Sequence, residues 1–593
     1  MHTNNKKSTL LQLWNYLSRR RRKQFWLLLF LMNIASLAEI VSVGAVLPFL
    51  GVLTAPEQVF QHPLMQPVIQ ILELTDPSQL TLPLTIFFIT AVLLAGVIRL
   101  TLLYVMTRLS FATGADLSIN IYRRTLYQEY AVHLSRNSSE VINGIITKTN
   151  TVIGGIIAPI LTFISSIILL VGIMGALFIV NIEVALSALI GFGVLYWLVI
   201  RYTKNQLKGN SQIVADQSTN MVKSLQEGLG GIRDVLIDDT QQLYCQLYRN
   251  ADLPLRRALG NNQFISGSPR YVSEAIGMAL IAGLAYVMTR QEGGISTAIP
   301  LLGALALGAQ RMLPALQQSY AAYSAIQGSK SSFKDVLSFL DQPLPEYAGQ
   351  QSKKSILFEK EIKLKNLSFR YTGDSPWVLK NVNLSIKKGT RVGFIGATGS
   401  GKSTLIDIII SLLPPTSGEL IVDQELLDSE KCMTWRANIS HVPQNIYLSD
   451  GTIEENIAFG IPKDKIDSKR VKKAAQQAQI SELIEQWSCG YQTLVGERGV
   501  RLSGGQRQRI GIARALYKQV SILIFDEATS ALDSETEQEV MKAINKLDKD
   551  LTILIIAHRL TTLKSCDRII KLDKNHKIQI LSHEEIKSLN NKE

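Results

Sequence analysis

Cysteine is scarce in this sequence. The 593 residues contain four, and no two of them have the C-x-x-C spacing of zinc sites and redox motifs. All four fall in segments whose predicted location is cytoplasmic, where thiols stay reduced. The sequence therefore predicts neither a disulfide framework nor a structural zinc site. The four are Cys245, Cys432, Cys489 and Cys566.

Lysine and arginine are missing from a long stretch near the amino terminus. After the run RRRRK at Arg19–Lys23, no basic residue occurs until Arg99. Because basic residues flank membrane spans on the cytoplasmic side, this asymmetry predicts a cytoplasmic amino terminus. The run could also be a nucleic-acid patch or a twin-arginine signal, but its position beside a long apolar run favours an anchor at the membrane surface.

The formal net charge of +13 would suggest nucleic acid as a partner if the protein were soluble. Here the basic residues cluster in predicted cytoplasmic loops and flanks, as expected for a membrane protein. We therefore predict acidic lipid headgroups, and no nucleic acid, as the partner of this charge.

Long apolar runs are confined to the first 340 residues. Each is near the ~20 residues that cross a bilayer, which predicts six spans. An even number of spans returns the chain to the cytoplasm. The long polar stretches after the second and fourth runs suit helices that extend into the cytoplasm. The runs occupy about 25–53, 83–107, 149–181, 184–201, 271–289 and 294–320.

The stretch GATGSGKS at Gly396–Ser403 has the G-x-x-x-x-G-K-S pattern of a phosphate-binding loop. It lies between a strand-like run, Arg391–Ile395, and a helix-like run, Thr404–Leu413. Glycines allow backbone N–H groups to face phosphates, Lys402 reaches the β- and γ-phosphates, and the Ser403 hydroxyl completes a Mg²⁺ shell. The residues predicted to bind the nucleotide here are Gly396, Ala397, Thr398, Gly399, Ser400, Gly401, Lys402, Ser403 and Thr404.

An apolar, β-branched run ends in two carboxylates in SILIFDEATSALD, Ser521–Asp533. This pattern is typical of a buried parallel strand that ends at a nucleotide site. We expect Asp526 to hold Mg²⁺ and Glu527 to orient the attacking water. A solvated strand end is the alternative, but it does not explain why a core strand ends in Asp-Glu.

Between these motifs, LSGGQR at Leu502–Arg507 begins a helix-like stretch. The N–H groups and the small hydroxyl at such a helix start can bind an anion. The alternative is a simple helix cap.

With these motifs the chain resembles an ATP-binding cassette protein over residues 356–580, and LSGGQ is that family's signature. The resemblance implies a head-to-tail pair of cassettes that encloses ATP and Mg²⁺. Tyr371 would stack on adenine, Gln444 would sense Mg²⁺ and the membrane domain, and His558 would be the switch histidine. Each also has an ordinary alternative, as a strand aromatic, a loop polar residue and a satisfied histidine. The signature residues that would contact the γ-phosphate held by Lys402 of the other subunit are Ser503, Gly504, Gly505 and Gln506.

The resemblance also covers the segments that would connect the cassette with the membrane domain. Gly228–Asp239 is similar to a coupling helix, with an ordinary loop as the alternative, and Val495–Gly499 is similar to a segment that touches the membrane-domain loops. Asp533 belongs to the loop that crosses between cassettes. Because no internal repeat supplies a second half, the chain is expected to be a half-transporter that functions as a homodimer.

The predicted fold class is a multidomain membrane protein, with an all-α domain of six transmembrane helices followed by an α/β P-loop domain. A polar, proline-containing stretch separates the two domains. The expected parts are a basic segment 1–24, a membrane domain 25–340 with an external helix at about 56–75, a linker 341–355 and a cassette 356–593.

Charged residues inside the spans are costly and usually face a cavity. Arg99, Arg270 and Arg311 would suit an anion, because a guanidinium pairs with phosphate oxygens at two points. The alternative is that Arg99 forms a structural ion pair with Glu39 and that Arg270 marks an interface.

The external segment Thr54–Leu82 lacks basic residues but is rich in apolar ones, which fits a short amphipathic helix or a cap on the bundle. With Leu37–Leu53 and the three arginines, it is similar to the lipid-linked oligosaccharide flippases of bacteria. That resemblance implies a polyprenyl-pyrophosphate glycan as substrate and the bacterial inner membrane as location. An exporter of peptides, lipids or drugs is the main alternative. An ATP-gated channel or regulator would be expected to have impaired hydrolysis residues, yet Glu527 and His558 are intact.

Overall fold

A computed structural model gives the fold as two compact units. It describes residues 9–581 apart from 55, 181, 290–311, 346, 350–355, 429–430, 529–531, 547–549, 558–562, 564–565 and 574–577. The first unit comprises residues up to 128 and 136–344, and the second comprises 129–135 and 345–593. The second unit therefore includes seven residues that the sequence analysis assigned to the membrane domain.

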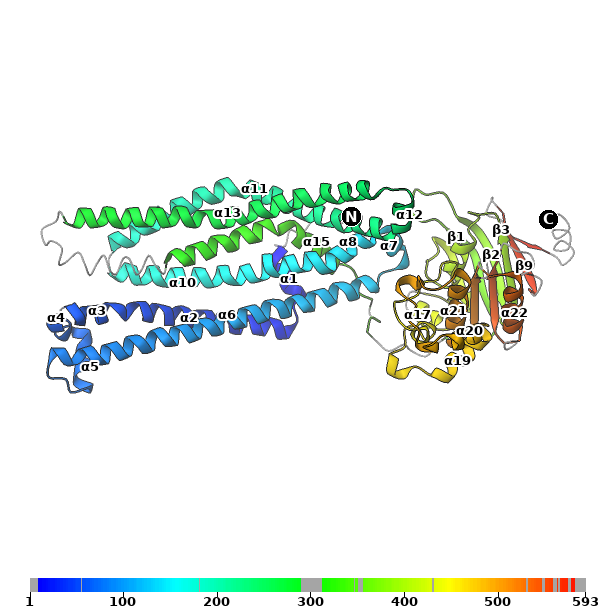
Figure 1. The fold of residues 1–593 in the computed structure, drawn as a ribbon, viewed down its shortest axis with the longest axis horizontal. Coiled ribbons are helices and arrows are strands. Elements are labelled where there is room, and N and C mark those ends of the chain that lie inside the picture. Colours follow the sequence, from blue (N-terminus) through cyan, green and yellow to red (C-terminus); the bar gives the residue numbers. More distant parts are fainter. Residues whose placement is uncertain are drawn as a thin grey trace. The chain divides into compact units, whose positions relative to one another are not determined.

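The first unit is entirely helical in its described part (Figure 1). Helices α11 and α13 pack along each other, and α2 packs along α6. The α-helices are α1 (Thr9–Tyr16), α2 (Arg19–Gly44), α3 (Val46–Thr54), α4 (Pro56–Phe60), α5 (Gln66–Ile71), α6 (Thr81–Leu126), α8 (Ser138–Asn143), α9 (Thr149–Val152), α10 (Ala158–Val180), α11 (Ile182–Gly230), α12 (Ile232–Ile237), α13 (Gln241–Thr289) and α15 (Lys330–Leu340). Short turns are η1 (Pro63–Met65), η2 (Pro77–Leu80), and the π-helical η3 (Gly144–Lys148) and η4 (Ile153–Ile157).

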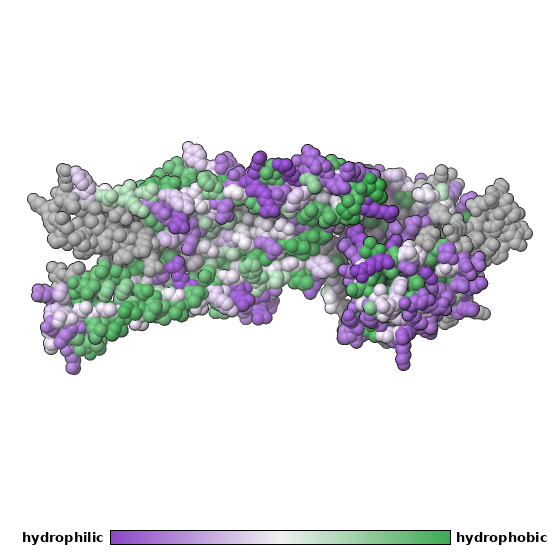
Figure 2. Space-filling model, viewed as in Figure 1, coloured by the Kyte–Doolittle hydropathy of each residue, from purple (hydrophilic) through white to green (hydrophobic). Residues whose placement is uncertain are grey.

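Three helical stretches within the described residues are long and apolar enough to cross a membrane, namely Arg19–Leu53, Pro77–Leu126 and Ser138–Phe178. They contain the first two predicted spans and the third as far as Phe178. Hydrophobic side chains cover the outside of α2, α3 and α6 (Figure 2). The fourth and fifth predicted spans lie in the 49-residue helices α11 and α13. Most of the sixth lies outside the described residues, although 312–328 are helical.

The external segment folds as two short helices, α4 and α5, joined through the turn η1, and not as one continuous helix. Proline at positions 56, 63 and 67 removes backbone donors and interrupts a longer helix. Val59, Phe60 and Ile69 pack with Leu80 and Leu84, while other apolar side chains such as Ile71 stay exposed. The segment thus covers the outer ends of α3 and α6 and still presents apolar surface.

The second unit contains two sheets. The four-stranded sheet is antiparallel, with the order β2 (Leu379–Lys387), β1 (Glu361–Phe369), β4 (Ser417–Val422) and β5 (Glu425–Leu426). The six-stranded sheet has the order β10 (Ile578–Leu581), β9 (Arg568–Leu572), β3 (Arg391–Gly396), β8 (Thr552–Ile556), β7 (Ile522–Asp526) and β6 (Ile439–Val442). Its strands from β9 to β6 are parallel.

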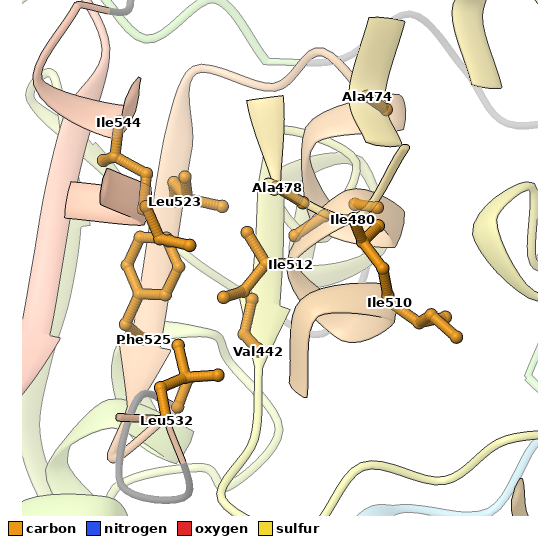
Figure 3. Packing of buried hydrophobic residues seen from close by; sticks show 14 of the residues in the cluster. Val442, Ala474, Ala478, Ile480, Ile510, Ile512, Leu523, Phe525, Leu532 and Ile544 are labelled. Atoms are coloured by element: carbon orange, nitrogen blue, oxygen red, sulfur yellow. The ribbon is translucent and has the colours of Figure 1, made fainter. Parts of the chain in front are cut away.

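Helices cover the sheets of the second unit and close two apolar cores. One core joins β7 and β6 to the helices at the signature side and is built from residues such as Val442, Ile480, Ile512 and Phe525 (Figure 3). The α-helices are α7 (Tyr130–Ser135), α16 (Lys402–Ile409), α17 (Lys431–Arg436), α18 (Ile453–Ile457), α19 (Ser468–Gln477), α20 (Ser481–Gln486), α21 (Gly504–Tyr517) and α22 (Ser534–Asn545), with turns η5 (Lys463–Lys465), η6 (Gly490–Gln492) and η7 (Glu497–Gly499). A helical domain followed by an α/β domain confirms the predicted fold class.

Candidate functional site

The loop from β3 to α16 has a backbone shape that requires glycine. Gly396, Gly399 and Gly401 all have positive φ, at 153°, 81° and 93°. A Cβ at Gly396 would lie 2.4 Å from the carbonyl oxygen of Leu572, so no side chain fits there. Helix α16 begins directly after the loop at Lys402, and its first N–H groups have no partner within the helix. The loop and the helix start together form a cradle of backbone donors.

Lys402 is buried, and its ammonium group folds back over the loop. Its Nζ donates to the carbonyl oxygens of Gly396 at 2.7 Å and Ala397 at 3.2 Å. Burial lowers the pKa of Lys402, and the charges of Glu527 and Asp526 act in the opposite direction. The two carboxylates are therefore close enough to stabilise the charged ammonium.

The hydroxyl groups of the loop indicate whether a phosphate would find hydrogen-bond partners here. Ser400 is 3 % exposed, and its Oγ has no hydrogen-bond partner among the described residues. A buried hydroxyl without a partner is costly unless a ligand satisfies it. Ser403 is exposed at the start of α16. The unsatisfied hydroxyl, the backbone donors and the buried ammonium suit the phosphates of a nucleotide.

The Asp526–Glu527 pair lies at the same edge of the sheet as the loop. Strands β3 and β7 both pair in parallel with β8, so their carboxyl ends point the same way. Glu527 has φ 49°, an uncommon conformation for a non-glycine residue that is often found at functional sites. Gln444 Nε2 donates to Glu527 Oε2 at 2.7 Å. The fold thus brings together three predicted motifs that are up to 131 residues apart in the sequence, at positions 396–403, 444 and 526–527.

Asp407 is a further carboxylate near the site that the sequence analysis did not select. It follows the loop on α16, and burial together with the charge of Asp526 raises the pKa of Asp407 to about 6. The available signal was a single acidic residue within the apolar run TLIDIII.

Tyr371 follows β1 and stands beside the loop. Its ring meets the edge of Phe369, with centroids 5.1 Å apart, and its hydroxyl lies 3.1 Å from Oγ1 of Thr404. The ring is about half exposed, so one face is open to a ligand. This position is compatible with the predicted stacking on adenine.

The signature residues begin α21 and form a helix cap. Ser503 Oγ accepts from the Gln506 N–H at 3.2 Å, and Gln506 Oε1 accepts from the Ser503 N–H at 2.9 Å. Gly504 and Gly505 form the first turn. Helix α21 packs against α18, α19 and β6, and no hydrogen bond joins it to the phosphate loop within the described part of this one chain. The cap interpretation holds for the single chain, and the positive helix end stays available to an anion.

Some of the other predicted residues lie outside the part of the chain that the structure describes, and others lie within it. His558 and Arg311 lie outside the described residues. Asp533 caps α22 by accepting from the Thr536 N–H at 3.0 Å, which lowers the pKa of Asp533. In Val495–Gly499, Arg498 has φ 53° within the turn η7.

Helix α7 belongs to the cassette unit although its sequence lies between the second and third spans. Ala131 packs against the core formed by β1, β2 and α16. Burial and the charges of Asp407 and Tyr371 raise the pKa of Tyr130, which indicates that α7 lies near these two residues. This contact was not predicted from the sequence, where a break in the helical pattern near Gln128 was the one local indication of a separate helix.

The membrane arginines have carboxylate partners. Arg99 Nη1 lies 3.8 Å from Glu39 Oε1, and Glu39 is buried. Arg270 Nε donates to Glu274 Oε1 at 2.9 Å, one helical turn away on α13. Arg99 therefore forms the ion pair with Glu39 that was predicted from the sequence as the alternative to an anion site. Both guanidinium groups remain more than half exposed.

Comparisons with known proteins agree with both units. Residues 379–530 match the family described as ABC transporter, and residues 26–296 match the family described as ABC transporter transmembrane region. An ATP-dependent lipid A-core flippase of Alkalilimnicola ehrlichii is 32% identical over 67% of this chain and 67% of the relative. The flippase of the same name from Paraburkholderia xenovorans is 27% identical over 79% of this chain and 78% of the relative. A solved structure of a bacterial Atm1-family ABC exporter with ATP bound has a similar fold, with a TM-score of 0.77, 22% identity and 96% of each chain covered.

The raised pKa of Asp407 predicts a pH-dependent stability. An ordinary Asp titrates near 3.8, whereas Asp407 in the folded chain titrates near 6. The folded state therefore loses stability as pH rises from about 4 to about 6 and stays lower above that. We expect Asp407→Asn to raise the thermal unfolding midpoint of the full chain at pH 8 more than at pH 4.5, as followed by tryptophan fluorescence.

The exposed Asp464 provides a matched control, because Asp464→Asn should change the midpoint little at either pH. An equal gain for Asp407→Asn at both pH values would show that burial does not disfavour the charged carboxylate.

The hydrogen-bonded Glu527 predicts a separation of binding from hydrolysis. Glu527→Gln keeps the shape of the side chain but removes its ability to accept a proton. We expect ATP turnover to fall at least about a hundredfold while binding of a fluorescent ATP analogue is retained. Lys402→Ala should instead lose tight nucleotide binding. Turnover at the wild-type rate in Glu527→Gln would rule out this carboxylate as the group that orients water.

Proposed function

This chain belongs to the ABC transporter family, and we propose that it is a homodimeric flippase for a polyprenyl-pyrophosphate-linked oligosaccharide or a related glycolipid. In general terms the chain is an ABC exporter half-transporter, which binds ATP and couples its hydrolysis to transport across a membrane. The proposed step moves the glycolipid from the inner to the outer leaflet of the bacterial inner membrane.

The nucleotide site supports a hydrolytic role for both cassettes of the dimer. The loop Gly396–Ser403 and Lys402 would bind the phosphates, and Tyr371 would stack on adenine. Glu527 would align the attacking water, with Gln444 orienting Glu527 through their hydrogen bond of 2.7 Å. His558 would complete the site as the switch histidine.

Mg²⁺ is the metal that fits these residues. It prefers oxygen ligands, keeps several waters, and is commonly bound by one carboxylate together with substrate phosphates. Asp526, the Ser403 hydroxyl and Gln444 would hold it. When bound, the ion offsets the negative charge that develops on the transferred phosphoryl group.

A second copy of the chain would complete each ATP site. The signature residues Ser503 to Gln506 cap a helix whose positive end can bind an anion, and within the described residues no hydrogen bond joins them to the phosphate loop of the same chain. Helix α12 also presents an apolar face, because Ile232, Leu236 and Ile237 are 47 %, 60 % and 67 % exposed. We infer that α12, within the predicted coupling segment Gly228–Asp239, docks on the partner's cassette.

The observation that carries the substrate class is the relation to flippases over most of the chain. The relatives' names describe flipping of lipid A-core, which supports a glycolipid as cargo. Exposed arginines in the spans would attract a pyrophosphate, and the apolar outer surface of α5 would engage a hydrocarbon tail. Because Arg99 and Arg270 have carboxylate partners, phosphate binding would involve an exchange of partners. Arg311 is included on the sequence alone.

A test of the substrate uses ATPase activity of the purified protein in liposomes. The additions are a polyprenyl-pyrophosphate glycan, a lipid A-type glycolipid, a peptide mixture and plain phospholipid. We expect the pyrophosphate lipid to stimulate turnover several-fold, and Arg99→Ala, Arg270→Ala and Arg311→Ala to reduce this stimulation while basal turnover is kept. Glu274→Gln should strengthen stimulation, because it frees Arg270 from its carboxylate.

Two outcomes would contradict the proposed substrate. Stimulation by peptide with the arginines dispensable would indicate a general exporter. Stimulation by the lipid A-type glycolipid alone would assign this chain the cargo named for its relatives and exclude the polyprenyl lipid.

A further inference from the structure

An apolar cavity of about 280 Å³ lies where α1 meets the cytoplasmic part of the helix bundle. Its walls come from α1, α2, α6, η4 and α10, and twelve of its thirteen lining residues are apolar. Leu10, Trp14 and Phe25 form one side, and Ile160 and Ile164 form another. This volume is about twice that of an apolar protein cavity known to take up benzene. It can therefore hold a length of hydrocarbon chain.

The cavity offers nothing that would retain water. Among the described residues that line it, Thr113 alone is polar, and the Thr113 hydroxyl already donates to the carbonyl oxygen of Leu109 at 2.7 Å. A buried water needs two to four polar partners. An apolar ligand is thus the favoured occupant.

The surroundings of the cavity correspond to the cytoplasmic boundary of a bilayer. The apolar part of α2 begins at Phe25, one residue after the basic run Arg19–Lys23. Trp26, Leu10 and Leu11 are exposed, at 65 %, 47 % and 54 %, as expected for side chains that face lipid. The cavity therefore lies at the depth where acyl chains meet their headgroups.

The basic run divides into residues that hold the protein together and residues that do not. Arg21 pairs with Asp116 at 2.8 Å, and Arg22 donates to the carbonyl oxygens of Trp14 and Asn15 at the end of α1. Arg19, Arg20 and Lys23 are exposed, and their side chains form no hydrogen bond or ion pair with the described residues. On α2 these three cations precede the lining residues Phe25 and Trp26 by at most seven residues, or about two helical turns. Cations this near an apolar cavity match an anionic headgroup with a hydrocarbon tail.

We propose that this cavity binds one acyl chain of an anionic phospholipid of the cytoplasmic leaflet, whose phosphate is held by Arg19, Arg20 and Lys23. The site contains none of the residues proposed above to bind the nucleotide or the transported molecule, so it does not depend on the proposed function. The cavity is also connected with α15 through contacts made by α1. Leu13 lines the cavity and packs against α15, and the Tyr16 hydroxyl donates to Asp341 at the end of α15. An occupied cavity thus fixes α1 against the helix that precedes the linker.

The test uses the full chain in nanodiscs of phosphatidylcholine that contain a small fraction of phosphatidylglycerol with a photoreactive diazirine in one acyl chain. We expect labelling of lining residues on α1 and α10, identified by peptide mapping. Changing Arg19, Arg20 and Lys23 together to Gln should reduce this labelling at least about tenfold at limiting lipid. Ile164→Trp, which fills the cavity, should abolish it without changing the charge.

A matched control changes Arg201, Lys204 and Lys208 of α11 to Gln, which removes three exposed basic residues elsewhere. This control should label like the wild type, and basal ATP turnover reports that each variant is folded. Equal labelling by a phosphatidylcholine probe would overturn the proposed headgroup selectivity. An equal loss of labelling in this α11 control would show that the effect comes from the overall surface charge and not from Arg19, Arg20 and Lys23, which would contradict the proposed site. Absence of label from α1 and α10 in the wild type would show that no lipid enters the cavity.

Discussion

The parallel pairing of β3 and β7 with the strand between them, β8, is the constraint on which the catalytic arrangement depends. It places the ends of two apolar strands at one edge, so the loop with Lys402 faces the carboxylates of Asp526 and Glu527. The opposite charges stabilise each other in a partly buried setting, and Lys402 is further held by its own loop carbonyls. The phosphates of a bound nucleotide would replace those carbonyls, because phosphate oxygens are stronger partners for an ammonium group.

Much of the cassette site could be predicted from the sequence because its chemistry is local. The glycine spacing dictates the loop backbone, and an apolar run that ends in Asp-Glu identifies the strand end. Contacts made only by folding could not be predicted. Asp407 gains its raised pKa from burial and from Asp526, and α7 joins the cassette across more than two hundred residues of sequence. The pairing of Arg270 with Glu274 was within reach, since the two are four residues apart on one helix.

The membrane half follows from the sequence less completely. Length and hydropathy predicted six spans, and three helical stretches among the described residues are long and apolar enough to cross a membrane. Prolines divide the external segment into α4 and α5, and the partner of Arg99 depends on how α2 and α6 pack. The basic run beside the first span has two functions that composition alone does not separate. Arg21 and Arg22 hold α6 and α1, whereas Arg19, Arg20 and Lys23 are exposed at the start of the helix that contributes Phe25 and Trp26 to an apolar cavity. Packing thus decides which charges are structural and which can bind lipid.

The central claim is that each ATP site is completed by the signature helix of a second chain. It is tested most directly by disulfide trapping in a variant without its native cysteines, with Ala397→Cys in the phosphate loop and Gly505→Cys in the signature, on the Glu527→Gln background. Disulfides form only when the Cα atoms lie within about 7 Å of each other. The account predicts a cross-linked dimer that forms with ATP and Mg²⁺ and requires both cysteines. A cross-link confined to one chain, or none with ATP and Mg²⁺ present, would contradict it.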